Sequence, residues 1–562
     1  MVNLPPPGVL LALVGLVLLF IRSPQLRKAI ILISPLIVLA TIWSIPDNTV
    51  SLGTHFLFWD LVPVRMDPLG RLFATIFSLM AFAGGLFALR QKRVSELSAA
   101  FVYAGGAIGV ALAGDLITVF IFWELMAIAS TVVIWSAVTP ESYKASIRYL
   151  MLHLLGGVIL MAGIIGHVVE HGDIAFQSMS PDSWSHILIL VGFLINAGAP
   201  PFSSWLSDAY PEASYTGTVF LSAFTTKTAV YVLIRGFPGT EILIYLGLFM
   251  VFYGIVYALL ENDMRRILVY SIINQVGFMV VGIGIGTEMA LNGAAAHAFA
   301  HIIYKGLLLM SAGAVLYRTN ERKCSNLGGL FQSMPLTTIC GTIGALAISS
   351  FPFTSGFVSK SMIATAAAEQ HLAFVWYLLA AASAGVFLHA GIKFPWFVFF
   401  QKDSGMRPKD PPWNMSAAMV LFAALCIGIG CYPDPLYALL PYATNYVPYT
   451  VPHVVNMLQL LLFAGLAFFL LLPWMKRTLT ITLDLDWLYR RLFPRVWVVG
   501  SAAFIVYQQR VSAFTELMVY RTIMSLKRIH GGKGLLSRNV STNSASIGAL
   551  VLLCVWLVSF YK

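Results

Sequence analysis

Residues 297–309 read HAFAHIIYKGLLL, an apolar segment that carries His297, His301 and Lys305 at intervals of four residues. On an α-helix this spacing places the three side chains on one face, each about one turn from the next. Histidine titrates near neutral pH and a buried lysine can lose its proton, so the stripe is typical of a proton path. A metal site and structural core histidines are the alternatives. Because no carboxylate or cysteine lies nearby in sequence, we expect no metal.

The composition of the whole chain excludes a soluble protein. Of 562 residues, 59% are hydrophobic and 10% are charged, whereas a soluble domain carries about 25% charged residues. Roughly sixteen apolar runs approach the ~20 residues that cross a bilayer, the first centred near residue 15 and the last near residue 553. The predicted fold class is therefore an all-α polytopic membrane protein.

Positive charge is concentrated in alternate loops and in the C-terminal tail. The net charge is +11, and the tail after Trp474 contributes +9, from twelve lysines and arginines against three acidic residues. Basic loops face the cytoplasm, so both termini are predicted to lie outside. We expect a multi-pass protein of the inner (cytoplasmic) membrane that contacts anionic lipids, and no nucleic acid as a partner.

The tail itself does not read as an ordinary span. Residues 476–545 are rich in apolar side chains but interrupted by basic ones. This pattern predicts a basic, amphipathic lateral helix along the cytoplasmic membrane face, followed by a final transmembrane helix at 546–562. A partly ordered basic linker is the alternative.

Five ionisable side chains lie inside apolar runs, where each costs at least about 2.5 kcal/mol at a bilayer centre. They must face one another, water or polar backbone. All four cations are lysine and none is arginine, which keeps its proton in proteins. This choice favours a proton relay over structural ion pairs, although the proline break before Lys360 would place that lysine near a membrane interface. The five are Glu124, Lys227, Lys305, Lys360 and Lys393, and His389 lies one helical turn before Lys393.

A weak internal repeat interrupts two of the apolar runs. PPFSS at 200–204 recurs as FPFTS at 351–355, and proline inside a helix breaks its hydrogen-bond ladder. Pro200, Pro201 and Pro352 therefore predict two broken helices in corresponding positions, which point to an ion or substrate site. About five spans separate the breaks, and an odd number of spans makes the second copy inverted.

Taken in order, these segments resemble a known family. The series is FIFWELMAIAS (120–130), APPFSSWLSDAYPEAS (199–214), TTKTAVY (225–231), NDMRRILVYSIINQVG (262–277), HIIYKGLLL (301–309) and FPFTSGFVSK (351–360). It resembles the proton-translocating antiporter-like family, which includes the A and D subunits of the multisubunit Mrp Na⁺/H⁺ antiporters and the large membrane-arm subunits of respiratory complex I. The resemblance runs from about Asp67 to Phe400. The motifs are closest to the Mrp D subunit, and the tail is similar to the largest complex I antiporter-like subunit.

The resemblance implies about 14 core helices arranged as two inverted five-helix repeats with broken helices. It also implies a central axis of Glu124, Lys227, His301, Lys305 and Lys360, work inside a hetero-oligomer of membrane subunits, and no cofactor. The expected division is 1–95 (N-terminal transmembrane helices), 96–237 (first antiporter-like repeat), 238–402 (second repeat), 403–475 (C-terminal transmembrane helices), 476–545 (basic lateral segment) and 546–562 (final helix).

One position departs from the family pattern. The family places a lysine just before the first helix break, as the partner of the glutamate that Glu124 matches. Here the sequence reads INAGAPP, so Asn196 occupies that place. Asparagine forms hydrogen bonds but carries no charge. Either Lys227 takes over the pairing, or this half conducts differently, or it no longer pumps.

These features predict a proton- or cation-translocating subunit, similar to the D subunit of the Mrp Na⁺(cation)/H⁺ antiporters, that moves H⁺ and either Na⁺ or K⁺. The expected translocation residues are Glu124, Lys227, His297, His301, Lys305, Lys360, His389 and Lys393. The alternatives are an energising subunit for another transporter such as an inorganic-carbon uptake protein, a membrane-arm subunit of a complex I-like or hydrogenase-like enzyme, and a scaffold with an impaired path. The chain shows no nucleotide, flavin or iron–sulfur motif, so any redox catalysis would belong to a partner.

Overall fold

The computed structural model describes residues 5–51, 55–56, 58–473, 484–534, 537 and 541–561. The chain divides into two compact units, Met1–Asp486 and Trp487–Lys562, which we describe separately. The first residues of the predicted first span, 1–4, lie outside the described residues. So do 476–483, 535–536 and 538–540 of the predicted basic segment, and residue 562 of the predicted final helix.

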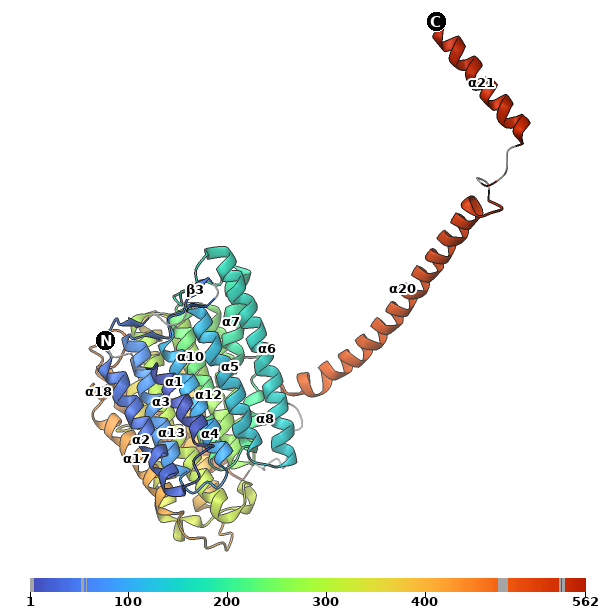
Figure 1. Cartoon of the computed structure of the whole chain (residues 1–562). Helices are drawn as coiled ribbons and strands as arrows, with labels where there is room; N and C mark the ends of the chain where they lie inside the picture. The colour runs from blue at the N-terminus through green and yellow to red at the C-terminus, as the bar shows by residue number, and fades with distance from the viewer. Residues whose placement is uncertain are drawn as a thin grey trace. The chain divides into compact units, whose positions relative to one another are not determined.

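The first unit is a bundle of apolar helices that run side by side (Figure 1). In the described parts of both units, thirteen helices are long and apolar enough to cross a membrane, and three shorter apolar helices accompany them. These sixteen helices coincide with the sixteen predicted apolar runs. In the first unit the helices are α1 (Pro7–Val17), α2 (Pro24–Ser44), α3 (Pro68–Phe87), α4 (Val94–Leu112), α5 (Leu116–Trp135), α6 (Pro140–His171), α7 (Trp184–Ala197), α8 (Trp205–Ala209), α9 (Gly217–Leu221), α10 (Thr225–Gly236), α11 (Ile242–Leu260), α12 (Met264–Ile285), α13 (Glu288–Thr319), α14 (Pro335–Ile348), α15 (Ser355–Glu369), α16 (Ala373–Val386), α17 (Trp413–Cys431), α18 (Asp434–Tyr437) and α19 (Val451–Leu471).

Short polar side chains start several of these helices. Asp67, Asp115 and Asp263 precede α3, α5 and α12, and each carboxylate accepts a hydrogen bond from a backbone N–H of the first turn. Thr139 and Ser142 form a reciprocal capping box at the start of α6. Caps satisfy donors that have no partner inside the helix, which fixes where each helix begins.

The loop between α2 and α3 carries the strands of the first unit. β1 (Val50–Ser51) pairs antiparallel with β4 (Val64–Arg65), and β2 (His55–Phe56) pairs antiparallel with β3 (Trp59–Asp60). Each strand has two residues, so the architecture is set by the helices.

Three interruptions open the helices of the interior. α7 ends at Ala197, and Gly198 follows in the left-handed conformation before the Pro200–Pro201 turn and α8. α14 ends at Ile348 and α15 begins at Ser355, with Phe353 at a φ of 66° between them. A third interruption, which the sequence did not predict, separates α9 from α10 at residues 222–224. At the end of a helix the last backbone carbonyls have no N–H partner within that helix, so each interruption makes such carbonyls available to other groups.

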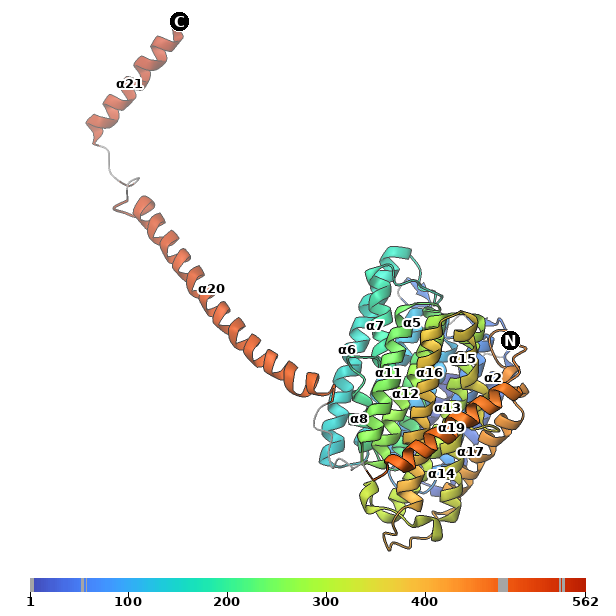
Figure 2. The same ribbon diagram turned by 180° about the vertical axis from the view of Figure 1, so that it is seen from behind.

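The centre of the first unit is formed by α12 and α13, whose side chains are buried along almost their whole length. α19 lies at the outside and crosses the bundle obliquely (Figure 2). After α16 the chain continues as two π-helical segments, Phe387–Lys393 and Trp396–Phe400. Because α12 and α13 are surrounded by other helices, the polar groups that they carry are buried inside the protein.

The second unit contains a long helix and a short apolar one. A π-helical turn, Leu488–Leu492, leads into α20 (Phe493–His530), a helix of 38 residues. α21 (Thr542–Phe560) is apolar and long enough to span a membrane. The all-α membrane fold class, with a long helix and a final apolar helix after the bundle, is thus confirmed.

Candidate functional site: a buried polar row

The stripe on α13 is fully buried and is held by its neighbours on α12 and α15. His297 lies with Nδ1 3.1 Å from the hydroxyl of Ser359 and with Nε2 3.0 Å from the side-chain oxygen of Gln275. Lys305 donates from Nζ to the hydroxyl of Ser271 at 3.0 Å and to the carbonyl of Leu268 at 3.3 Å.

Between them, His301 has no exposed surface, and neither ring nitrogen has a hydrogen-bond partner among the described residues. A buried imidazole without fixed partners is free to accept a proton from either side. The three side chains thus share one face of α13, as their spacing predicted. His297 and Lys305 have polar partners at the two ends of this stripe, and His301 between them has none among the described residues.

Lys227 lies in the first turn of α10, directly after the unpredicted interruption at residues 222–224. Its ammonium is fully buried and donates to the carbonyl of Ser222 at 2.7 Å and to the hydroxyl of Thr226 at 3.0 Å. Ser222 lies in the break, where its carbonyl is not required by a continuous helix. The interruption therefore supplies the oxygen that solvates the buried lysine.

The two lysines and the histidine form one electrostatic group. Lys227 and Lys305 lie close enough for their charges to interact, and His301 interacts with both. In the described part of the chain, no carboxylate lies within 4.0 Å of either ammonium. Both lysines are thus held by neutral dipoles, without counter-ions.

Lys360 is buried inside the bundle, near the start of α15. Its side chain is 3% exposed, and Nζ lies 4.0 Å from the ring centroid of Phe278. It also lines a cavity of about 370 Å³ together with His453 and Asn456 of α19. This cavity lies between Lys360 and α19, and its lining is mostly apolar.

Lys393 and His389 extend the group along the first π-helical segment. Lys393 donates from Nζ to the carbonyls of Ala258, Leu259 and Glu261 at 3.0, 2.6 and 2.6 Å, at the end of α11. Cations are favourable at a helix C-terminus, where carbonyls lack partners. His389 is close enough to Lys393 and Lys305 to interact with both electrostatically. We call the whole group the polar row: Lys227, His297, His301, Lys305, Lys360, His389 and Lys393.

Glu124 lies apart from these cations. Its carboxylate rests on Gly157 of α6, where an added Cβ would collide with Oε1. No basic side chain of the described residues lies within 4.0 Å of it, so Lys227 does not take over the pairing. Asn196 is buried at the end of α7, and its Oδ1 has no partner among the described groups. Glu124 is therefore held without a cationic partner among the described residues.

A set of buried polar residues between Glu124 and Lys227 was missed from the sequence. His153 lies one turn before Gly157 on α6 and stacks on Tyr149. The Tyr149 hydroxyl lies 3.4 Å from that of Thr225, which begins α10 two residues before Lys227. His153 stands inside the apolar run MLHLLGG (151–157) and meets the criterion that selected the other ionisable residues. The tyrosine and threonine had no such signal.

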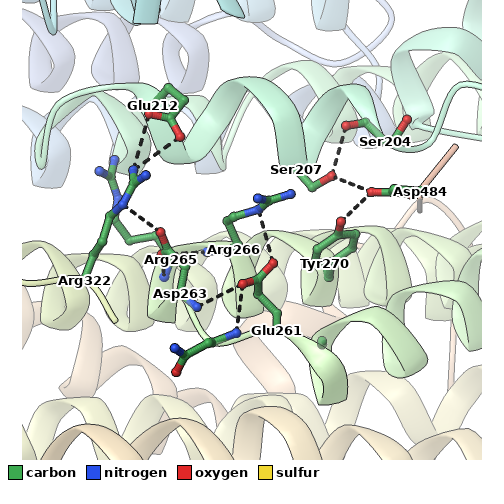
Figure 3. Close-up of polar contacts among 12 residues, drawn as sticks. Ser204, Ser207, Glu212, Glu261, Asp263, Arg265, Arg266, Tyr270, Arg322 and Asp484 are labelled. Atoms are coloured by element: carbon green, nitrogen blue, oxygen red, sulfur yellow. Dashed lines mark hydrogen bonds and ion pairs between the residues drawn. The ribbon is translucent and has the colours of Figure 1, made fainter. Parts of the chain in front are cut away.

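A second polar network lies around the N-terminal end of α12 and the neighbouring segments (Figure 3). Arg322 pairs with Asp263 at 3.0 Å and with Glu212 at 3.3 Å. Burial raises the pKa of Asp263, and the nearby arginines oppose this shift. Asp484 accepts hydrogen bonds from Tyr270 at 2.5 Å and from Tyr253. These contacts tie the end of the first unit to α11 and α12.

The fold and the site together define a class, namely a helical membrane protein with interrupted helices and an internal polar row. Residues 113–387 match the family model described as NADH:quinone oxidoreductase/Mrp antiporter, transmembrane. Over these residues the chain therefore matches that family, and the predicted resemblance is confirmed.

Curated relatives of this chain include subunits of cation/proton antiporters. The A/B subunit of a probable K(+)/H(+) antiporter from Rhizobium meliloti is 28% identical over 401 residues, which cover 66% of this chain and 40% of the relative. The D subunit of the Na(+)/H(+) antiporter from Alkalihalophilus pseudofirmus is 30% identical over 325 residues, 53% of this chain and 66% of the relative. The chain thus matches only part of the length of these curated relatives.

A solved structure shares the fold. The structure of the Mrp complex from Dietzia sp. contains a chain that superposes with a TM-score of 0.68 at 19% identity. The superposition covers 82% of this chain and 98% of that one.

Proposed function

We propose that this chain is a proton-translocating subunit of a multisubunit membrane complex, similar in role to the D subunit of a cation/proton antiporter. The observation that carries the proposal is the burial of Lys227 and Lys305 with no carboxylate within 4.0 Å in the described structure. Two permanent charges held this way would cost several kcal/mol. Lysines that gain and lose protons in turn avoid that cost.

The proposed path uses the order of the polar row. Protons pass among Lys227, His301 and Lys305, and reach Lys393 through His389. Lys360 exchanges protons with the cavity beside α19. Glu124 and Asn196 form the first-half branch, which His153 and Tyr149 connect to Lys227. The eight predicted translocation residues, the three helix-breaking prolines and the six-part division of the chain remain part of this proposal.

The family match also leads us to propose the partners, the exchanged cation and the membrane. We propose membrane subunits as partners, Na⁺ or K⁺ as the exchanged cation, and the inner (cytoplasmic) membrane as the location. The relatives support the partners and the cations, since they are named as subunits of K(+)/H(+) and Na(+)/H(+) antiporters.

A second candidate is the membrane arm of a redox enzyme, which the family description favours because it joins NADH:quinone oxidoreductases with antiporters. The sequence alternatives of a scaffold and of an inorganic-carbon energising subunit stand beside it. Mild-detergent purification of the tagged chain, with mass spectrometry of its partners, separates them. Small hydrophobic partners with a second antiporter-like subunit support the antiporter. Flavin- or iron–sulfur-bearing partners support the redox arm, and a large soluble partner alone supports the energising role.

The scaffold alternative has its own test at Asn196. A scaffold conducts no protons as it stands, whereas our proposal expects proton flux in the wild type and in the Asn196→Lys variant. Flux that appears only in Asn196→Lys would show that the wild-type path is interrupted at this residue.

The relay itself is tested at Lys305. In membrane vesicles carrying the assembled complex, Lys305→Ala should abolish ion-driven ΔpH formation. Lys305→Arg should assemble normally but give no turnover, because arginine keeps its proton. Lys144→Ala, at an exposed position early in α6, is the matched control and should transport like the wild type. Wild-type flux in Lys305→Arg would refute the relay.

A further inference from the structure

Three histidines outside the polar row meet at the ends of α6 and α7. His167 and His171 are one turn apart on α6, and their rings stack with centroids 4.5 Å apart. His186, in the first turn of α7, lies with its ring centroid 5.2 Å from that of His167 and 5.1 Å from that of His171. One ligand atom from each ring can be chosen so that all three lie within 4.8 Å of one another.

The second nitrogen of each ring faces an oxygen. Nδ1 of His171 lies 3.2 Å from the carbonyl of His167, and Nδ1 of His186 lies 2.7 Å from the carbonyl of Ser180. Nε2 of His167 lies 3.5 Å from a carboxylate oxygen of Asp173. A neutral imidazole that donates from one nitrogen presents a lone pair at the other. Such outer partners are the usual means of orienting a histidine ligand.

Two of the remaining nitrogens, on His167 and His186, face each other. Nδ1 of His167 lies 3.0 Å from Nε2 of His186. Because the Nδ1 of His186 donates to a carbonyl, its Nε2 holds a lone pair, and a single proton lies between the two rings. A metal ion would take the place of this proton, and the N–H of His167 would then face Asp173.

The helix ends that carry the cluster are accessible from water. α6 has 32 residues and so measures about 48 Å at 1.5 Å per residue, against a hydrocarbon core of about 30 Å. The end of α6 and the start of α7 rise above the neighbouring helices (Figures 1 and 2). His171 is exposed, whereas His167 and His186 are buried. The site is therefore anchored on one side and open on the other.

We propose that His167, His171 and His186 form a binding site for a divalent transition metal of the Zn²⁺ class. His167 would bind through Nδ1 and the other two through Nε2, which leaves a coordination position open toward solvent. Imidazole ligands suit this class of metal, and three histidines with an open position are a known zinc arrangement. The metal would clamp α6 to α7, the two helices that carry Gly157 and Asn196. The proposal is independent of the proposed transport function.

The test is a binding titration of the full chain, purified with the subunits that accompany it. After removal of metal with a chelator, Zn²⁺ alone is added at neutral pH, and the bound metal per chain is measured by elemental mass spectrometry. We expect one Zn²⁺ per chain in the wild type and at least tenfold weaker binding in His171→Ala and His186→Ala. With Co²⁺ as the probe, the visible spectrum should change in the wild type and not in these variants.

Two further variants keep the result interpretable. His55→Ala removes an exposed histidine that pairs with Asp60 in the loop before α3, and it should bind Zn²⁺ like the wild type. Asp173→Asn keeps all three ligands and should weaken binding by about tenfold or more, because it removes the orienting carboxylate. His171 is exposed, so His171→Ala should fold normally. Equal Zn²⁺ binding in the wild type and His171→Ala, or no retained Zn²⁺ in the wild type, would overturn the proposal.

Discussion

The carboxylate of Glu124 lies directly against Gly157, and this contact limits which side chains α6 can carry at that position. A methyl group at Gly157 would meet the carboxylate, whereas one at Gly156 would lie 3.3 Å from a methyl of Ile195. The two neighbouring glycines therefore face different groups. One borders the candidate site, and the other borders α7.

We predict that Gly157→Ala lowers proton flux and the melting temperature of the purified complex. The new methyl must displace the carboxylate of Glu124, and overpacking of an interior costs about 1–3 kcal/mol. Gly156→Ala is the matched control and should have a smaller effect on both quantities. Equal effects of the two substitutions would mean that the contact with Glu124 is of no special importance.

At the scale of the helices, Lys393 serves a structural role together with its proposed transport role. It joins the first π-helical segment to the last carbonyls of α11. Lys305, in contrast, is held by one hydroxyl and one carbonyl. Removal of the two lysines should therefore differ in its effect on assembly.

We predict that Lys393→Ala reduces the yield and thermal stability of the complex more than Lys305→Ala does. Buried carbonyls left without a donor cost about 1–3 kcal/mol each. Lys393→Arg should restore assembly in part, since arginine also donates to carbonyls, but not turnover. The measurements are complex yield, melting temperature and ΔpH formation. A Lys393→Ala complex as stable as the wild type would contradict the capping role.

The helices themselves were predictable, because a span needs only length and apolar composition. All sixteen apolar runs form helices, including the run around Lys227, which is split in two. The split was not predicted, since residues 222–224 read SAF and contain neither proline nor glycine. It depends on the packing of Ser222 and Lys227 in three dimensions. The burial of Lys360 likewise depends on how α15 folds back after its break.

The candidate site was predictable to the extent that it consists of charges in apolar surroundings. That criterion selected Lys227, Lys305 and Lys360, and applied evenly it also selects His153. It does not select Tyr149, Thr225 or Gln275, which become part of the site only through neighbours on other helices. It also missed the three-histidine cluster, because two of its histidines come from one helix and the third from the next.

At the scale of the whole molecule, the polar row lies entirely within the first unit. The second unit, Trp487–Lys562, contributes none of its residues. Within the described residues, α20 and α21 have no buried side chains of their own. An apolar, basic surface of this kind is available for lipid or for other subunits.

We predict that deletion of residues 487–562 leaves the membrane body folded but lowers the amount of assembled complex. Flux per assembled complex should remain, because Asp484 and its tyrosine partners stay in place. The melting temperature of the body, the yield of the complex and the flux are measured together. Deletion of residues 541–562 alone separates the contribution of α21. Loss of the body's cooperative melting would contradict the division into two units.

The carbonyl of Ser222 has one further consequence for timing. It is part of the main chain and cannot turn away, as a water molecule would, when Lys227 gives up its proton. The vacated place therefore stays polarised for a positive charge, and the proton tends to return. In the proposed path, the departure of this proton needs a second charge to arrive nearby, and His301 would carry that charge. The proposed path would therefore act as an electrostatic latch: it would resist the leak of single protons and advance when two of them move in step.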